Sequence, residues 1–154
     1  VLSYHVIEHL WRPNVEFHLR EVYRVLQSNG GKLEIKCPNI EAAAIAYVNN
    51  DIGWFNNSKS PACPGDTIGE KFMRWIVSEG EDTYVHNRNN IMLGGLAHQW
   101  GWDLQQLTEM AKKCGYSIVT KEYNPKKDHE VRVTFHKRCL QAWHVGIHKE
   151  NFLK

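Results

Sequence analysis

The sequence lacks the long apolar run and the strong charge of one sign that are typical of membrane-spanning and nucleic-acid-binding proteins. No stretch approaches the roughly 18 consecutive apolar residues of a membrane-spanning helix. The net charge of the 154 residues is only +2, so the composition indicates neither a nucleic-acid partner nor an anionic membrane surface. With 42% hydrophobic and 23% charged residues, the chain has the composition of an ordinary globular domain with a buried core.

Closely spaced cysteines and a glycine-rich nucleotide loop are also missing. The four cysteines are widely separated and form no Cys-x-x-Cys pair, which argues against a zinc ribbon and a dithiol redox motif. A reduced, cytoplasmic setting is the simplest interpretation. No turn resembles the glycine-rich fingerprint that cradles a nucleotide after the first strand of a doubly wound fold. The chain has no initiator methionine and opens within an apolar run, so we expect it to be a piece of a longer protein.

The first forty residues predict a strand, a helix and a second strand. Residues 1–7 form a short apolar run that favours a buried strand. Apolar positions recur at helical spacing over residues 14–26. Gly30 and Gly31 then indicate a turn that needs a positive φ or has no room for a side chain. Residues 32–37 alternate polar and apolar side chains, so the three elements together predict an α/β fold with a parallel crossover unit.

The rest of the chain predicts further helices and strands around two polar stretches. Helices are expected at residues 41–48, from a cap at Asp66 or Thr67 to residue 77, and from a cap at Asp103 to a close at Cys114 and Gly115. Strands are expected at residues 116–123, 130–135 and 140–148. Residues 49–65 and 80–95 are expected to be loops. The second of these is long enough for a lid or binding loop.

Four short motifs resemble one known family. They are His5-Val6-Ile7-Glu8-His9-Leu10, Arg20-Glu21-Val22-Tyr23-Arg24-Val25-Leu26, Gly30-Gly31-Lys32-Leu33 and Pro38-Asn39. Their order and spacing resemble the segment after the fourth strand of class I S-adenosylmethionine-dependent methyltransferases of the small-domain type. Further along, residues 98–103 and 104–116 resemble a later passage of the same family, and residues 140–149 resemble its last, antiparallel strand.

The resemblance implies a truncated Rossmann-like methyltransferase sheet, with parallel core strands and an antiparallel late strand pair. Residues 1–154 would be the C-terminal part of a single methyltransferase domain, with a helical and loop insertion at about residues 40–97. The late pair would join residues 117–123 to residues 140–148. The glycine-rich turn under the methionine moiety and the acidic residue that holds the ribose would lie in a missing N-terminal half. We therefore expect the chain alone to bind S-adenosylmethionine weakly or not at all.

The position of the first motif predicts a candidate site. In an open parallel sheet, ligands bind outside the carboxyl ends of the strands, so residues 3–9 are expected to face the crevice. We assign Ser3, Tyr4 and Glu8 to contacts with the cofactor S-adenosylmethionine, and His5 to catalysis as an acid-base group. The alternative is that Glu8 and His9 only cap and orient the next helix.

His98, Trp100 and Trp102, which precede the late helix, are the candidates for binding the methyl acceptor. Methyl transfer from a sulfonium is an in-line displacement, for which a protein mainly supplies proximity, alignment and a general base. The alternative for the two tryptophans is packing in the core. The sequence leaves the acceptor unidentified, whether a small molecule or another partner, because its determinants lie in variable loops.

Two other functions fit parts of the sequence. Residues 5–9 match H-x-x-E-H, in which two histidines one helical turn apart bind zinc. Because His5 falls in the expected strand and no third ligand is obvious, we predict no metal site and scattered histidines elsewhere. The second alternative is a non-catalytic methyltransferase-like binding module, since a fold alone does not fix a function. The coding sequence upstream of Val1 would separate this module from the enzyme.

Overall fold

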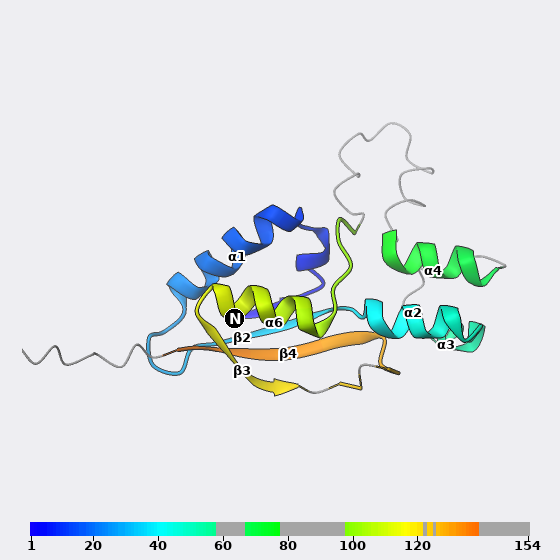
Figure 1. Ribbon diagram of the computed structural model, residues 1–154. Helices are drawn as coiled ribbons and strands as arrows, with labels where there is room; N and C mark the ends of the chain where they lie inside the picture. Colours follow the sequence, from blue (N-terminus) through cyan, green and yellow to red (C-terminus); the bar gives the residue numbers. More distant parts are fainter. Residues whose placement is uncertain (58–66, 78–97, 122, 125, 139–154) are drawn as a thin grey trace, which may run out of the picture.

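The computed structural model has an open four-stranded sheet with helices on one face (Figure 1). It describes residues 1–57, 67–77, 98–121, 123–124 and 126–138. The strands are β1 (Leu2–Tyr4), β2 (Lys32–Pro38), β3 (Tyr116–Lys121) and β4 (Glu130–Lys137), in the order β1-β2-β4-β3. β1 runs parallel to β2, while β4 runs antiparallel to both β2 and β3. The fold is therefore mixed α/β, and the predicted parallel pairing of the first two strands is confirmed.

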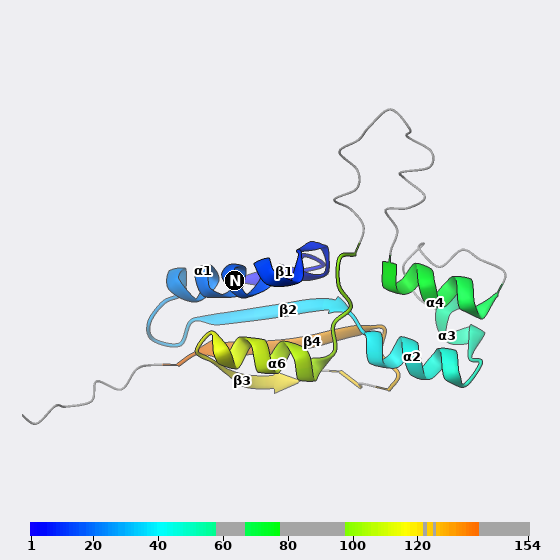
Figure 2. The same ribbon diagram turned by 45° about the horizontal axis from the view of Figure 1, so that its top comes forward.

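Two helices cover the same face of the sheet, as Figures 1 and 2 show. α1 (Arg12–Val25) connects β1 to β2, and α6 (Leu104–Lys113) precedes β3. Every second residue of β2 and β4 is buried, because successive side chains of a strand point to opposite faces. The main core combines the helix and strand side chains, among them Val15, Leu19, Leu33, Ile35, Leu107, Ala111, Val131, Val133 and Phe135. Each large side chain buried in this way contributes about 1.5–3 kcal/mol.

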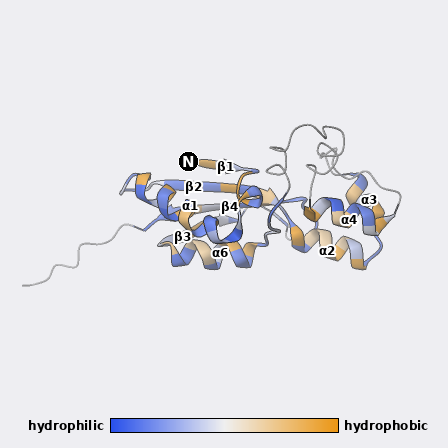
Figure 3. Ribbon diagram, turned by 90° about the horizontal axis from the view of Figure 1, so that it is seen from above, coloured by the Kyte–Doolittle hydropathy of each residue, from blue (hydrophilic) through white to orange (hydrophobic). Residues whose placement is uncertain are grey.

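Three further helices group beyond the end of β2, apart from α1 and α6 (Figure 3). They are α2 (Ile40–Val48), α3 (Ile52–Asn56) and α4 (Ile68–Val77). They share a small second core made of Ala43, Ala46, Phe55 and Trp75. These helices lie in the range that we expect to be an insertion, which stays a prediction. None of the helices within the described ranges is both long and apolar enough to span a membrane.

Several helix ends are confirmed by their capping bonds. At α4, the Thr67 amide donates to Glu70 Oε2 at 2.9 Å and the Glu70 amide donates to Thr67 Oγ1 at 3.2 Å, which is a capping box. At α6, the Gln106 amide donates to Asp103 Oδ1 at 2.8 Å. Gly115 follows α6 with a φ of +94°, a conformation that glycine adopts at little cost. The local sequence was therefore sufficient to predict where α4 and α6 begin and where α6 ends.

Two of the predicted elements are wrong in extent. The strand expected over residues 1–7 ends at Tyr4, because His5 has a φ of +51°, which no strand residue adopts. The chain then forms a short 3-10 helix, η1 (Ile7–His9). The expected loop at residues 49–65 contains α3, whose first turn is capped by Asp51 through the Trp54 amide at 3.0 Å. An aspartate cap can start even a single turn of helix.

Within the described residues, β3 forms an antiparallel pair with β4. Tyr116 is opposite Lys137, and β4 also pairs with β2 along its whole length. β4 thus lies between β2 and β3, which leaves β3 at the outer end of the order. The partner expected from the resemblance, residues 140–148, lies outside the described residues.

Candidate functional site

The carboxyl ends of β1 and β2 lie side by side, and the site is built around them. The two strands pair in register up to Tyr4 opposite Lys36, and the His5 amide donates to the Lys36 carbonyl at 2.9 Å. Past β1 the chain turns into η1, and past β2 it enters α2. This is the edge at which an open parallel sheet binds ligands. Residues 3–9 therefore lie at the end of β1 beside β2, and their facing a ligand crevice stays a prediction.

His5 lies between two carboxylates. Its Nδ1 is 3.1 Å from Glu8 Oε1 and its Nε2 is 2.9 Å from Glu130 Oε1. The hydrogen bond with Glu8 raises the pKa of His5 to about 9, with a further contribution from Glu130 and against the opposing effect of burial. Burial acts to raise the pKa of Glu130, but its hydrogen bond with His5 leaves that pKa below its usual value. The two carboxylates thus favour the protonated form of the ring and hold it from both sides.

Glu8 is the most buried carboxylate of this edge. It is only 1% exposed, and its Oε2 has no hydrogen-bond partner. The other oxygen bonds to His5, so the carboxylate does not cap the short helix η1 that contains it. A buried carboxylate oxygen without a partner is costly. This arrangement favours a ligand-binding role for Glu8 over the alternative of a helix cap.

The segment that carries the predicted acceptor residues packs directly on η1. The amides of Gln99 and Trp100 both donate to the Glu8 carbonyl, at 2.6 and 3.2 Å. Trp102 Nε1 donates to the Ile7 carbonyl at 3.3 Å. The structure therefore brings the first motif and residues 98–102 together, although they are far apart in the sequence.

The two tryptophans of that segment have different environments. Trp102 is 1% exposed and belongs to the main core. Trp100 is 40% exposed, its Nε1 donates to Gln106 Oε1 at 3.1 Å, and the Arg12 guanidinium lies 5.2 Å from its ring centroid. The geometry gives Trp102 a packing role and leaves Trp100 with a surface that a ligand can reach.

Ser3 and Tyr4 lie on opposite faces of β1. Ser3 is 4% exposed and its hydroxyl has no hydrogen-bond partner. Tyr4 points to the uncovered face, where its hydroxyl donates to Glu34 and the Lys36 ammonium lies 4.3 Å from its ring centroid. The hydrogen bond to Glu34 raises the pKa of Tyr4. Of the two, Ser3 has the polar atom that is open to a partner.

One cluster at this edge was missed by reasoning from the sequence. Glu8, His9 and His98 each place a ligand-type atom within 4.8 Å of the others, and the two imidazole centroids are 5.0 Å apart. The Nδ1 of His9 is also buried without a partner. The H-x-x-E-H pattern named two of these residues, but it paired them with His5, which the structure places outside η1 and between two carboxylates. No spacing rule connects His9 with His98.

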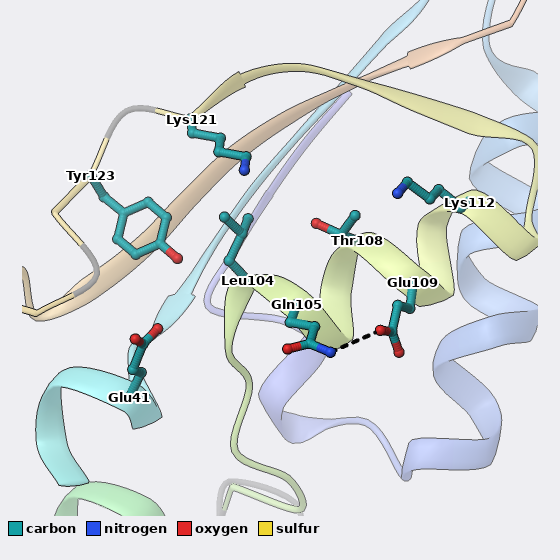
Figure 4. A pocket seen from close by; sticks show the side chains of 8 residues that line it. All are labelled: Glu41, Leu104, Gln105, Thr108, Glu109, Lys112, Lys121 and Tyr123. Atoms are coloured by element: carbon teal, nitrogen blue, oxygen red, sulfur yellow. Dashed lines mark hydrogen bonds between the residues drawn. The ribbon is translucent and has the colours of Figure 1, made fainter. Parts of the chain in front are cut away.

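A separate hollow of about 470 Å³ lies between α6 and the end of β3 (Figure 4). Its lining comprises Glu41, Leu104, Gln105, Thr108, Glu109, Lys112, Lys121 and Tyr123. The Tyr123 hydroxyl has no hydrogen-bond partner, and burial, with the nearby charge of Glu41, raises its pKa to about 12. The lining contains none of the residues that the sequence analysis assigned to the site.

Comparison of the chain with models of known protein families gave no match, and comparison with curated proteins gave none either.

Proposed function

We propose that this chain takes part in S-adenosylmethionine-dependent methyl transfer to an acceptor that is still to be identified, as part of a Rossmann-like methyltransferase sheet. One observation carries the proposal: the first motif of the resemblance begins at the carboxyl end of β1, and the fourth lies at the adjoining carboxyl end of β2. The second motif lies in α1, and the third forms the turn into β2. The first and fourth motifs thus lie at the edge at which such a sheet binds a nucleotide-like ligand, and the second and third lie in the connection from β1 to β2.

The polar atoms present fit the cofactor in part. Ser3 Oγ and Glu8 Oε2 are buried and unpartnered, and a hydroxyl and a carboxylate suit the ammonium and hydroxyl groups of S-adenosylmethionine. Tyr4 would contribute from the other face of β1. When bound, the cofactor supplies the methyl group of a sulfonium. No glycine-rich turn lies in residues 1–154, so we expect a weak affinity for the chain by itself.

His5 is the residue that we propose for catalysis. Its two ring nitrogens are fixed by Glu8 and Glu130, which sets the orientation of the imidazole. Because the ring is half exposed, an incoming acceptor would replace Glu130 as the hydrogen-bond partner of Nε2. His98 and the open side of Trp100 would shape the acceptor pocket, and Trp102 would support it from the core. The free, buried thiols of Cys37 and Cys114 are compatible with the cytoplasmic location predicted from the sequence.

Cofactor binding is tested by NMR titration of the 154-residue chain with S-adenosylhomocysteine, the demethylated product of the cofactor. Weak binding suffices, because chemical shifts report millimolar affinities. We expect saturable shifts of the amide signals of Ser3, Tyr4 and Glu8. Ser3→Ala and Glu8→Gln should weaken binding, whereas Glu109→Gln, on the exposed side of α6, should not. Shifts confined to other parts of the chain would contradict the proposal, and so would the absence of shifts in the same titration of the gene's complete product.

Catalysis is tested by transfer of tritiated methyl groups from S-adenosylmethionine by the gene's complete product. His5→Asn should lower the rate by about 100-fold or more, the scale for loss of a positioned acid-base group. Asn is chosen because it tolerates the positive φ of this position. If the same variant keeps its S-adenosylhomocysteine shifts, the loss lies in the chemistry. Normal cofactor binding without any methyl transfer by the wild type would instead favour the non-catalytic module.

A further inference from the structure

We propose that Glu8, His9 and His98 bind a divalent transition-metal ion. One ligand-type atom from each residue lies within 4.8 Å of the other two. The two histidine rings meet edge to face, with an interplanar angle of 64°. Glu8 and His9 come from η1, and His98 comes from the segment before α6. The group therefore assembles only in the folded chain.

Two polar atoms of these residues are buried and have no protein partner. They are Glu8 Oε2, in a side chain that is 1% exposed, and His9 Nδ1. A buried polar atom without a partner lowers the stability of the fold unless a ligand satisfies it. A cation placed among the three residues would accept an electron pair from the carboxylate and from the imidazole at once.

The backbone holds the two halves of the cluster together without the ion. The amides of Gln99 and Trp100 both donate to the carbonyl of Glu8. Gln99 follows His98 and Glu8 precedes His9, so these bonds hold the two histidine-bearing segments together. His5 Nδ1 bonds to the second oxygen of Glu8 at 3.1 Å. Such an outer contact orients a ligating carboxylate and tunes its affinity. The site is therefore largely formed before a metal arrives.

The donor set selects the class of ion. Two imidazoles and one carboxylate favour zinc, iron, cobalt or nickel, whereas magnesium and calcium prefer sites made of oxygen atoms alone. Ligand distances of about 2.0–2.2 Å require the three ligand atoms, which now lie within 4.8 Å of one another, to move closer together when the ion binds. Three protein ligands leave at least one position for water or a substrate oxygen, as in catalytic zinc sites.

This inference does not rest on the proposed methyl transfer. Metal binding is measured without S-adenosylmethionine and without an acceptor. A metal would occupy the oxygen of Glu8 that the proposed function assigns to the cofactor, which would leave Ser3 and Tyr4 as the cofactor contacts. If both ligands bind through this oxygen of Glu8, Zn²⁺ and S-adenosylhomocysteine should compete. Titration with Zn²⁺ alone tests only the metal site, and titration with S-adenosylhomocysteine alone tests only the cofactor site.

The test is a titration of the chelator-stripped 154-residue chain with CoCl₂, followed by its optical spectrum. We expect one Co²⁺ per chain, with ligand-field bands and no thiolate charge-transfer band, and displacement by Zn²⁺. His98→Ala should weaken binding by more than about 100-fold, beyond the 10- to 100-fold typical of losing an outer contact. His5→Asn should fall within that smaller range. His136→Ala, which removes a histidine of β4, is the matched control and should bind as the wild type does.

A second measurement needs no variant. On addition of Zn²⁺, the imidazole nitrogen signals of His9 and His98 should shift in the NMR spectrum, while those of His18 and His136 stay in place. Absence of saturable Co²⁺ binding would overturn the proposal. So would a thiolate band, unchanged binding by folded His98→Ala, equally tight binding of Mg²⁺, or Zn²⁺ shifts at His18 or His136.

Discussion

Nε2 of His5 lies 2.9 Å from Oε1 of Glu130, although 125 positions separate the two residues in the sequence. The contact joins the end of β1 to the first residue of β4, across the intervening strand β2. β1 is only three residues long. This side-chain bridge therefore supplements a short parallel ladder at the edge of the described sheet.

The bridge predicts a pH-dependent stability. The folded-state pKa of His5 is raised to about 9, while an unfolded histidine titrates near 6.5. The stabilisation is then complete below about pH 6.5 and is lost as the pH rises through about 9. Because the side chain is 50% exposed, we expect a loss of only about 1 kcal/mol. Urea unfolding of chelator-treated protein across this window measures it.

His5→Asn is the reference for that measurement, because it removes the titrating group and keeps a residue that tolerates positive φ. The difference in unfolding free energy between the wild type and this variant should shrink with rising pH. Glu130→Gln should give an intermediate pH dependence, since the partner keeps its shape but loses its charge. Parallel pH profiles for the wild type and His5→Asn would contradict the bridge.

The adjacent glycines before β2 should respond differently to substitution. Gly30 has a φ of +77° and open space around it, whereas a Cβ on Gly31 would lie 2.6 Å from the backbone oxygen of Gln27. Gly31→Ala should therefore cost about 1–3 kcal/mol through overpacking. Gly30→Asn should cost less than about 1 kcal/mol, since Asn visits the left-handed region. Melting curves of the two variants measure both losses of stability. Equal losses would contradict the distinct roles of the two glycines.

These glycines illustrate which parts of the fold the sequence could predict. Positive φ and lack of space were the two reasons expected for the pair, and each glycine has one of them. Elements with local signals, such as α1, β2 and α6, were predicted within a few residues. The strand over residues 1–7 was predicted too long, because an apolar run does not reveal that His5 leaves the extended conformation.

Only the part of the site that depends on the order of neighbouring elements in the sequence could be predicted. The edge past β1 follows from the strand, helix and strand order, so Ser3 and Glu8 were found as candidates. The contact of His98 with His9, and of Glu130 with His5, depends on which distant segments fold onto η1 and β1. No periodicity or spacing in one sequence contains that information. The partner of β3 was likewise a question of tertiary pairing.

Asn39, the residue after β2, is expected to be a sensitive position for stability. It is fully buried, its Oδ1 accepts the amides of Glu41 and Ala42, and its Nδ2 donates to the Asp128 carbonyl at 2.9 Å. Asn39→Ala should cost about 1–3 kcal/mol, the sum of a lost cap and a lost hydrogen bond to the Asp128 carbonyl. Denaturant unfolding measures the loss.

Two further variants test whether the loss of stability is specific to the Asn39 side chain. Asn39→Ser keeps an acceptor for the cap but cannot reach Asp128, so its loss should be about half of the Ala value. Asn56→Ala, at an exposed position of α3, should stay within about 0.5 kcal/mol of the wild type. If Asn39→Ala resembled Asn56→Ala, the junction between β2 and α2 would not depend on this side chain.

The last prediction separates packing from ligand contact at the two tryptophans before α6. Trp102→Ala should cost about 3–5 kcal/mol, because it empties a fully buried site in the main core. Trp100→Ala should cost about 1 kcal/mol or less, the scale of its cation–π contact with Arg12. Unfolding free energies of both variants test this order.

Kinetics of methyl transfer distinguish the two tryptophans further, because only an acceptor contact should alter KM. Trp100→Ala should raise the acceptor's KM and leave kcat nearly unchanged, the result of losing binding that the ground state and transition state share. Trp102→Phe, which keeps most of the core volume and loses the bond to the Ile7 carbonyl, should lower stability but leave both constants near those of the wild type. A raised KM in Trp102→Phe, with an unchanged KM in Trp100→Ala, would reverse the roles that burial assigns to the two rings.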